Sequence, residues 1–309
     1  MSFTSRFTLR RHGLAAAGTT VVLALTLAAC GSSKDSSDSS MPGMDHGSMP
    51  SASASSHSMD SMPGMDHGSM DADDGLSDAK DGYELMSSAG ELPAGRATGY
   101  TFQVMGPDGK PVTGFAVDQA KRMHFYAIRS DLTGFQHLHP TMAGDGTWTA
   151  DLSALEPGSW RMYASFAPDS GTGKGKDFVL SRTATVPGDA KPTPLPAATT
   201  NAEVDGYTVT VKGELTAGTA HPMTVSISKD GKPVTDLQPY LDTYAHLTAF
   251  HEGDQALAHL HPETAVNGDH GGPDLSFHAM LPKPGNWRMF LQFRTGGKLH
   301  TAAVTLRVS

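Results

Sequence analysis

The chain has 309 residues, enough for about two domains, and a net charge of -9 from 23 basic and 32 acidic residues. No block of lysine or arginine follows the first few residues, so the composition gives no electrostatic footprint for nucleic acid. The only cysteine is Cys30, which excludes a disulfide within the chain. The sequence shows no nucleophile motif and no glycine-rich phosphate loop, and we therefore predict that the protein is not an enzyme.

The first 29 residues have the pattern of an export signal. Arginines at positions 6, 10 and 11 precede an apolar run from Leu14 to Ala29, which is short for a membrane span of about 20 residues. The run ends in Leu27-Ala28-Ala29-Cys30 and resembles a bacterial lipobox. The resemblance implies cleavage before Cys30, a lipid on its sulfur, and a protein anchored to the outer, extracytoplasmic face of the cell membrane. An ordinary signal peptide followed by a chance cysteine is the alternative.

The segment after the signal, residues 30–92, is predicted to be a leader and linker without a fold. Between Gly31 and Asp74 it contains no Val, Ile, Leu, Phe, Tyr or Trp, so it has too little apolar surface to offset its ordering entropy. The phrase MPGMDHGSM occurs in it twice, at 41–49 and at 62–70. Thioether sulfur suits Cu(I), and imidazole accepts either oxidation state of copper. We predict loose copper capture by Met41, Met44, His46, Met49, His57, Met59, Met62, Met65, His67 and Met70. A low-complexity spacer that arose by repeat slippage is the alternative.

The rest of the chain is predicted to be all-β, with two tandem Ig-like sandwich domains at 93–187 and 201–309, joined by a proline-rich linker at 188–200. Their general architecture is expected to be that of cupredoxin and CopC-like domains. Short apolar runs alternate with turns, and no window has sustained helical periodicity. The second series repeats the first: DGKPVT, HLHP and PG-x-WRM each occur once in both. Trp160 and Trp287, which follow the Pro-Gly pairs, are expected to be core residues.

Each unit carries a histidine that twelve intervening residues separate from an HxHP motif. His124, His137 and His139 form this set in the first unit, and His246, His259 and His261 form it in the second. A hairpin turn centred on Gly253-Asp254 would set His246 opposite His261 and diagonal to His259 on one sheet face. The same register centred on residues 131–132 would set His124 opposite His139.

Three imidazoles on one face can hold a divalent ion. Such a nitrogen site favours copper, with zinc as the alternative. We therefore predict a metal site in at least one of the two units, with His278 as an additional candidate ligand in the second. The alternative is that each HxH pair is an exposed strand end.

Two resemblances support this chemistry. The Met/His phrase resembles segments of bacterial copper-resistance proteins. The His…HxHP set with its following PGxWR strand resembles a family of bacterial secreted domains, which implies a β-sandwich and a link to heavy metals. The expected function is a monomeric, lipid-anchored copper-binding buffer, scavenger or donor whose partner is the membrane and another extracytoplasmic copper protein. The alternative is a non-metal cell-surface binding module with structural histidines.

Overall fold

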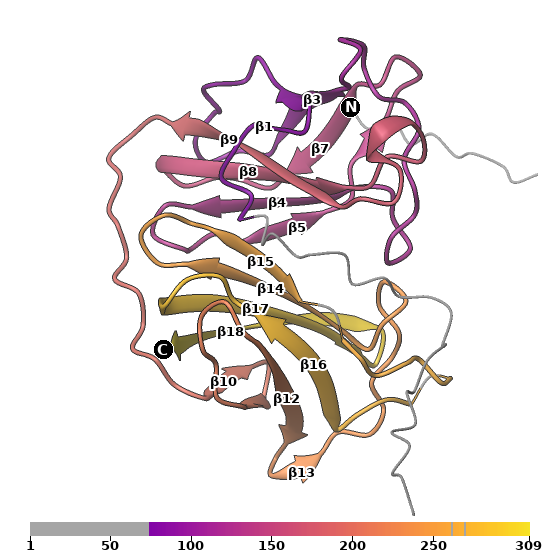
Figure 1. Ribbon diagram of the computed structural model, residues 1–309. Coiled ribbons are helices and arrows are strands. Elements are labelled where there is room, and N and C mark those ends of the chain that lie inside the picture. The colour runs from indigo at the N-terminus through magenta and orange to yellow at the C-terminus, as the bar shows by residue number, and fades with distance from the viewer. Residues whose placement is uncertain (1–73, 261, 269) are drawn as a thin grey trace, which may run out of the picture. The chain divides into compact units, whose positions relative to one another are not determined.

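The folded part of the chain consists of two tandem Ig-like β-sandwiches (Figure 1). The structure is a computed structural model that describes residues 74–260, 262–268 and 270–309, with His259 described by its backbone alone. The predicted signal peptide, the lipidation site Cys30 and the Met/His ligands of the leader lie outside these residues. Within the described ranges, no helix is both long and apolar enough to cross a membrane.

The first sandwich packs a five-stranded sheet, in the order β1-β2-β3-β7-β6, against a four-stranded sheet, in the order β5-β4-β8-β9. The strands of the five-stranded sheet are β1 (Ala79–Lys80), β2 (Tyr83–Met86), β3 (Thr98–Met105), β6 (Thr141–Met142) and β7 (Trp148–Leu152). Those of the four-stranded sheet are β4 (His124–Arg129), β5 (Gln136–Leu138), β8 (Gly158–Phe166) and β9 (Phe178–Val186).

The second sandwich repeats this plan with its own pair of sheets. One sheet has the order β10-β11-β12-β13, with β16 also paired to β12, and the other has the order β15-β14-β17-β18. The strands of the first of these sheets are β10 (Asn201–Val204), β11 (Tyr207–Lys212), β12 (Ala220–Lys229), β13 (Lys232–Pro233) and β16 (Asp274–Met280). Those of the other are β14 (Ala245–His251), β15 (Leu257–Leu260), β17 (Gly285–Thr295) and β18 (Lys298–Val308).

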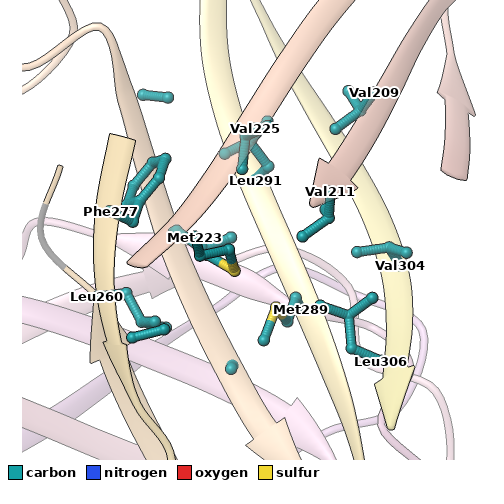
Figure 2. Packing of buried hydrophobic residues seen from close by; sticks show 14 of the residues in the cluster. Val209, Val211, Met223, Val225, Leu260, Phe277, Met289, Leu291, Val304 and Leu306 are labelled. Carbon is teal, nitrogen blue, oxygen red and sulfur yellow. The ribbon is translucent and has the colours of Figure 1, made fainter. Parts of the chain in front are cut away.

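Each sandwich has its own apolar core between its two sheets. Figure 2 shows part of the second core, where Met223 and Val225 of β12 approach Met289 and Leu291 of β17. Trp160 and Trp287 are buried as predicted. Each indole N–H donates to the backbone carbonyl four residues earlier, at 2.9 Å in both copies. The repeated PG-x-WRM motif therefore builds the same core anchor twice.

The first sandwich begins earlier than the sequence predicted. Strands β1 and β2 lie in the segment assigned to the linker, and Leu85 of β2 pairs with Val104 of β3. Tyr83 and Leu85 are buried in the first core. The sequence gives little sign of these strands, because they are short and their few apolar residues stand in an otherwise polar stretch.

The two sandwiches meet through a third apolar cluster, which we call the junction cluster. It draws residues from the four-stranded sheets of both sandwiches: Tyr126, Ile128, Leu132, Tyr163, Val179, Phe250, Leu257 and Phe290. Phe135, partly buried against it, stacks on Phe290 with ring centroids 4.3 Å apart. An aromatic side chain contributes about 1.5–3 kcal/mol when it is fully buried. The junction is therefore a packed interface, and β4 and β14 are buried on both faces.

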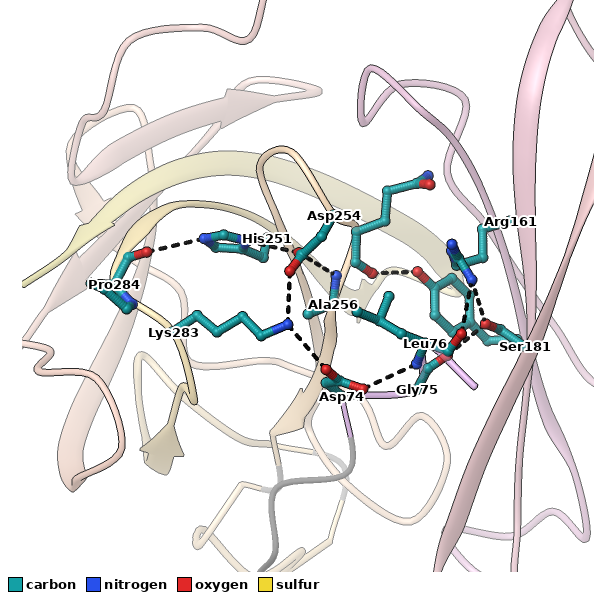
Figure 3. Close-up of polar contacts among 12 residues, drawn as sticks. Asp74, Gly75, Leu76, Arg161, Ser181, His251, Asp254, Ala256, Lys283 and Pro284 are labelled. Carbon is teal, nitrogen blue, oxygen red and sulfur yellow. Dashed lines mark hydrogen bonds and ion pairs between the residues drawn. The ribbon is translucent and has the colours of Figure 1, made fainter. Parts of the chain in front are cut away.

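Polar contacts close the same junction at the start of the described chain (Figure 3). The Asp74 carboxylate accepts a hydrogen bond from Lys283 Nζ at 3.0 Å. The backbone carbonyl of Asp74 accepts one from the Leu257 N–H at 2.8 Å. The next two carbonyls, of Gly75 and Leu76, accept from side chains of the first sandwich. The segment 74–76 is thus bonded to both sandwiches.

Candidate metal site

The outer face of β4 begins with a buried histidine. Phe125 and Ala127 pack in the first core, whereas His124, Tyr126 and Ile128 share the opposite face of the strand. Tyr126 and Ile128 belong to the junction cluster. His124 is only 2% exposed, because the second sandwich covers this face.

Strand β14 repeats the arrangement from the other side of the junction. Leu247 and Ala249 pack in the second core, and His246 shares the opposite face with Phe250. His246 is 1% exposed. Its ring lies against that of its counterpart His124, with centroids 5.4 Å apart and planes 10° apart. Contact between equivalent residues is expected where two copies meet about an approximate twofold axis.

Strand β5 adds two more imidazoles to this pair. His137 pairs with Tyr126 in the sheet and stacks on His246, with ring centroids 4.5 Å apart. His139 follows the end of the strand, and its ring centroid lies 4.8 Å from that of His137 and 5.1 Å from that of His124. Four histidines from both sandwiches therefore form one group, which we call the histidine cluster.

The donor set of the histidine cluster fits a transition-metal ion. One nitrogen each of His124, His137 and His246 lie within 4.8 Å of one another. Two nitrogens that each bind an ion at 2.0–2.1 Å in tetrahedral geometry are roughly 3.3 Å apart. Nδ1 of His124 and Nε2 of His137 are already 3.1 Å apart, close to the separation of two ligands of one ion. Nε2 of His139 is buried and has no hydrogen-bond partner among the described residues, which makes it a candidate fourth ligand.

Hydrogen bonds from outside the cluster orient two of the rings. Nε2 of His124 lies 3.1 Å from the carbonyl oxygen of Asp118, which can only accept, so this nitrogen carries the proton. Nδ1 of His137 lies 2.6 Å from Oε1 of Gln292 in the second sandwich. Such contacts to the outer nitrogen are the usual way in which a protein fixes the tautomer of a ligating histidine.

Burial favours the uncharged form of two histidines in the cluster, His137 and His139. It lowers the pKa of His137 well below its usual value, and nearby His139 and His124 lower it further, whereas the bond to Gln292 acts in the opposite direction. Burial, followed by the charges of His124 and Lys121, lowers the pKa of His139 to about 4. At neutral pH both imidazoles are therefore neutral, the form that binds metals.

A buried tyrosine lies beside the cluster. The Tyr126 hydroxyl is 3.2 Å from Nε2 of His246. Burial raises the pKa of Tyr126 far above its usual value. The phenol therefore stays protonated at neutral pH and serves as a hydrogen-bond partner of His246.

The predicted register of the first hairpin is confirmed. Tyr126 pairs with His137 and Phe125 with Leu138, so the next pair in this register sets His124 opposite His139. The second hairpin also has the predicted register, since Thr248 pairs with His259. The side chain of His259 and all of His261 lie outside the described part of the chain, so their roles as ligands stay predictions.

The predicted two-residue turn at Gly253-Asp254 is wrong. The His251 N–H donates to the carbonyl of Ala256 at 2.9 Å, which closes a four-residue loop over residues 252–255. The Asp254 carboxylate accepts a bond from the Ala256 N–H at 3.0 Å and stabilises this wider loop. The register is unchanged, because the loop is symmetric about the predicted centre.

The structure does not bring His278 to the histidine cluster. It lies on β16, where it pairs with Pro222 of β12 in the other sheet of the second sandwich. Its side chain is exposed, and Nδ1 lies 2.6 Å from Oε1 of Glu263. The sequence also predicted that the three histidines of a site would come from one unit, whereas the structure groups His246 with the histidines of the first unit.

Sequence reasoning missed Tyr126 and Gln292. Tyr126 is two residues after His124, and this spacing places both on one face of a strand. Gln292 could not be found this way, because it reaches His137 only through the contact between the sandwiches.

Another buried histidine, His300, lies outside the cluster and has a structural environment. Nδ1 of His300 lies 2.7 Å from the Asp205 carboxylate, and Nε2 lies 3.1 Å from the Thr295 hydroxyl. The order carboxylate, imidazole, hydroxyl resembles the catalytic triad of a hydrolase. However, Thr295 is only 5% exposed and its hydroxyl also bonds the Tyr207 hydroxyl at 2.7 Å, so it is not accessible as a nucleophile. The group ties β11 to the β17–β18 hairpin.

A family model described as a domain of unknown function, DUF8832, matches the chain twice, at residues 78–183 and 202–309. The two matches cover more than half of the chain and coincide with the two sandwiches. Curated proteins give no match to this sequence.

Several solved structures resemble the chain weakly. The Escherichia coli adhesin FdeC is 15% identical over 75% of this chain and 65% of its own, with a TM-score of 0.23. Salmonella alpha-2-macroglobulin reacted with methylamine is 10% identical over 76% of this chain and 15% of its own, with a TM-score of 0.24. A chimeric titin Z1Z2 tandem is 13% identical over 72% of this chain and 95% of its own, with a TM-score of 0.18. This chain thus spans less than two thirds of the adhesin and a small part of the macroglobulin, and these scores carry no argument about function.

Proposed function

Because the chain belongs to DUF8832, a family whose description assigns no function, its own residues must carry the argument, and we propose that it is an extracytoplasmic copper-binding protein. One observation supports this proposal most strongly. A largely buried cluster presents nitrogens of His124, His137 and His246 within 4.8 Å of one another. Imidazole nitrogens brought this close together from three strands are a donor set that suits a divalent ion. By the usual affinity order, imidazole nitrogens favour Cu(II) over Zn(II).

The leader sequence supports the same chemistry. Its ten methionine and histidine ligands between residues 41 and 70 provide soft sulfur for Cu(I) beside imidazole. The lipobox-like ending at Cys30 supports a lipid anchor on the outer face of the cell membrane. Segment 74–76, which directly follows the leader, is bonded to both sandwiches close to strand β15. Copper captured by the leader would pass to the histidine cluster, and the protein would act as a buffer, scavenger or donor.

The test is a Cu(II) titration of the full chain with His46, His57 and His67 replaced by serine, which we call the leader-silenced chain. Copper bound at one equivalent then reports on the sandwiches through nitrogen coupling in electron paramagnetic resonance. His137→Ala and His246→Ala are expected to weaken binding at least tenfold. His278→Ala, an exposed histidine on the other sheet, is the matched control and should leave binding unchanged. Equal binding by all three variants would contradict the proposed site.

The second candidate is a non-metal surface-binding module, which the weak likeness to an adhesin neither supports nor opposes. It predicts that the leader-silenced chain takes up no stoichiometric copper. The same titration therefore separates the two candidates.

A further inference from the structure

Gln292 connects the second sandwich to the histidine cluster. It lies on β17, pairs with His246 in the sheet and is 6% exposed. Its amide oxygen accepts from Nδ1 of His137 across the junction at 2.6 Å, and its Nε2 lies 3.5 Å from the Thr301 hydroxyl. An amide oxygen can only accept. With the Gln292 amide in this orientation, Nδ1 of His137 carries the proton and Nε2 carries the lone pair.

The facing ring is fixed in the complementary way. Nε2 of His124 donates to the Asp118 carbonyl, so its lone pair is on Nδ1. That Nδ1 faces Nε2 of His137 at 3.1 Å. Two lone pairs at this distance repel each other unless a cation lies between them. By accepting a hydrogen bond from Nδ1, Gln292 places the lone pair of His137 on Nε2, where it can bind a cation together with Nδ1 of His124.

We infer that Gln292 is the positioning residue that makes His137 a metal ligand, and that metal affinity consequently depends on the contact between the two sandwiches. This inference rests on the proposed function and adds a requirement to it. The first sandwich alone contains His124 and His137 but lacks the acceptor that orients His137. Contacts of this kind typically change metal affinity by about 10–100-fold.

The duplication supplies a matched comparison. Ser165 pairs with His124 in β8 as Gln292 pairs with His246 in β17, so the two residues are counterparts. The serine hydroxyl sits on Cβ and cannot extend as far as a glutamine amide. The orienting contact is therefore built by the second copy alone, and Ser165→Ala is an internal control.

The experiment measures Cu(II) affinity and nitrogen coupling in the leader-silenced chain and in three variants of it. Gln292→Met keeps the length of the side chain but removes the acceptor, and should weaken binding about 10–100-fold with one fewer coupled nitrogen. Gln292→Glu can only accept and should bind within threefold of the parent chain or more tightly. Ser165→Ala should bind as the parent does. The melting temperature of each metal-free variant separates loss of folding from loss of orientation.

The outcomes are distinguishable. If the parent chain binds Cu(II) and Gln292→Met binds equally well with the same coupling, the inference is wrong while the proposed function stands. Equal loss in Gln292→Met and Gln292→Glu would show a merely structural role and would also overturn it. If the parent chain takes up no Cu(II), the proposed function itself fails.

Discussion

At the scale of single residues, one glycine sets the path into strand β5 and so the position of His137. Gly134 has a φ of +69°, and a Cβ at this position would collide with the ring of the core residue Trp160. Gly95 has nearly the same φ, +68°, but nothing lies within 4 Å of the place where its Cβ would be. Substituting alanine at Gly95 therefore tests the cost of the left-handed backbone alone, and at Gly134 it tests that cost together with a steric collision.

Gly95→Ala is expected to cost about 1–2 kcal/mol of unfolding free energy, from the left-handed backbone alone. Gly134→Ala should cost about 1–3 kcal/mol more, because the Trp160 ring or the turn must shift. It should also weaken copper binding, since β5 carries His137. Urea denaturation of both variants measures the difference, and equal losses would contradict the collision.

At the scale of elements, the β14–β15 loop is organised by one carboxylate. Burial acts to raise the pKa of Asp254, but hydrogen bonds from Lys283, from the Ala256 N–H and from His251 lower it to about 2. The folded protein therefore binds fewer protons here than the unfolded chain, whose pKa is near 3.8. The stability that Asp254 adds is complete above this unfolded value and is lost as the pH falls from about 4 to 2.

Asp254→Asn should therefore reduce the loss of stability between pH 4 and pH 2. The Asp254 side chain is 38% exposed, so screening by solvent limits the effect to about 1 kcal/mol or less. Chemical denaturation across this range measures it. Asp189→Asn, which removes an ion pair exposed on the linker, is the control and should leave the slope unchanged. An unchanged slope in Asp254→Asn would show that the loop is held by other contacts.

The sequence predicted the strands and the hairpin register well, because both depend on local spacing. His124 and the HxHP motif share a face only in one register, and β5 and β15 have it. The junction was missed although a signal was present. After His124, residues 125–128 (FYAI) are a continuous apolar run rather than an alternating one, which indicates a strand buried on both faces. The sequence pattern does not show what covers the outer face of such a strand, because that contact joins residues far apart in the chain.

At the scale of the whole molecule, one ion per chain is expected, bound between the sandwiches. Phe290→Ala removes a ring that stacks on Phe135 across the junction, and should lower both stability and copper affinity. Val304→Ala, in the core of the second sandwich, should lower stability without changing the copper affinity of the folded protein. Native mass spectrometry and calorimetric titration of the leader-silenced chain measure stoichiometry and affinity. Two tightly bound ions, or equal affinity in both variants, would contradict a site that spans the junction.

The contact of His124 with its own counterpart His246 has a consequence for ancestry. A protein with a single copy of this unit could not bring the two residues together within one chain. It could do so by pairing with a second molecule through the same face, because an isologous interface places equivalent residues across its axis. The tandem chain is then a covalently fused dimer. The two halves of a fused chain can differ in sequence, so one half can have Gln292 where the other has Ser165.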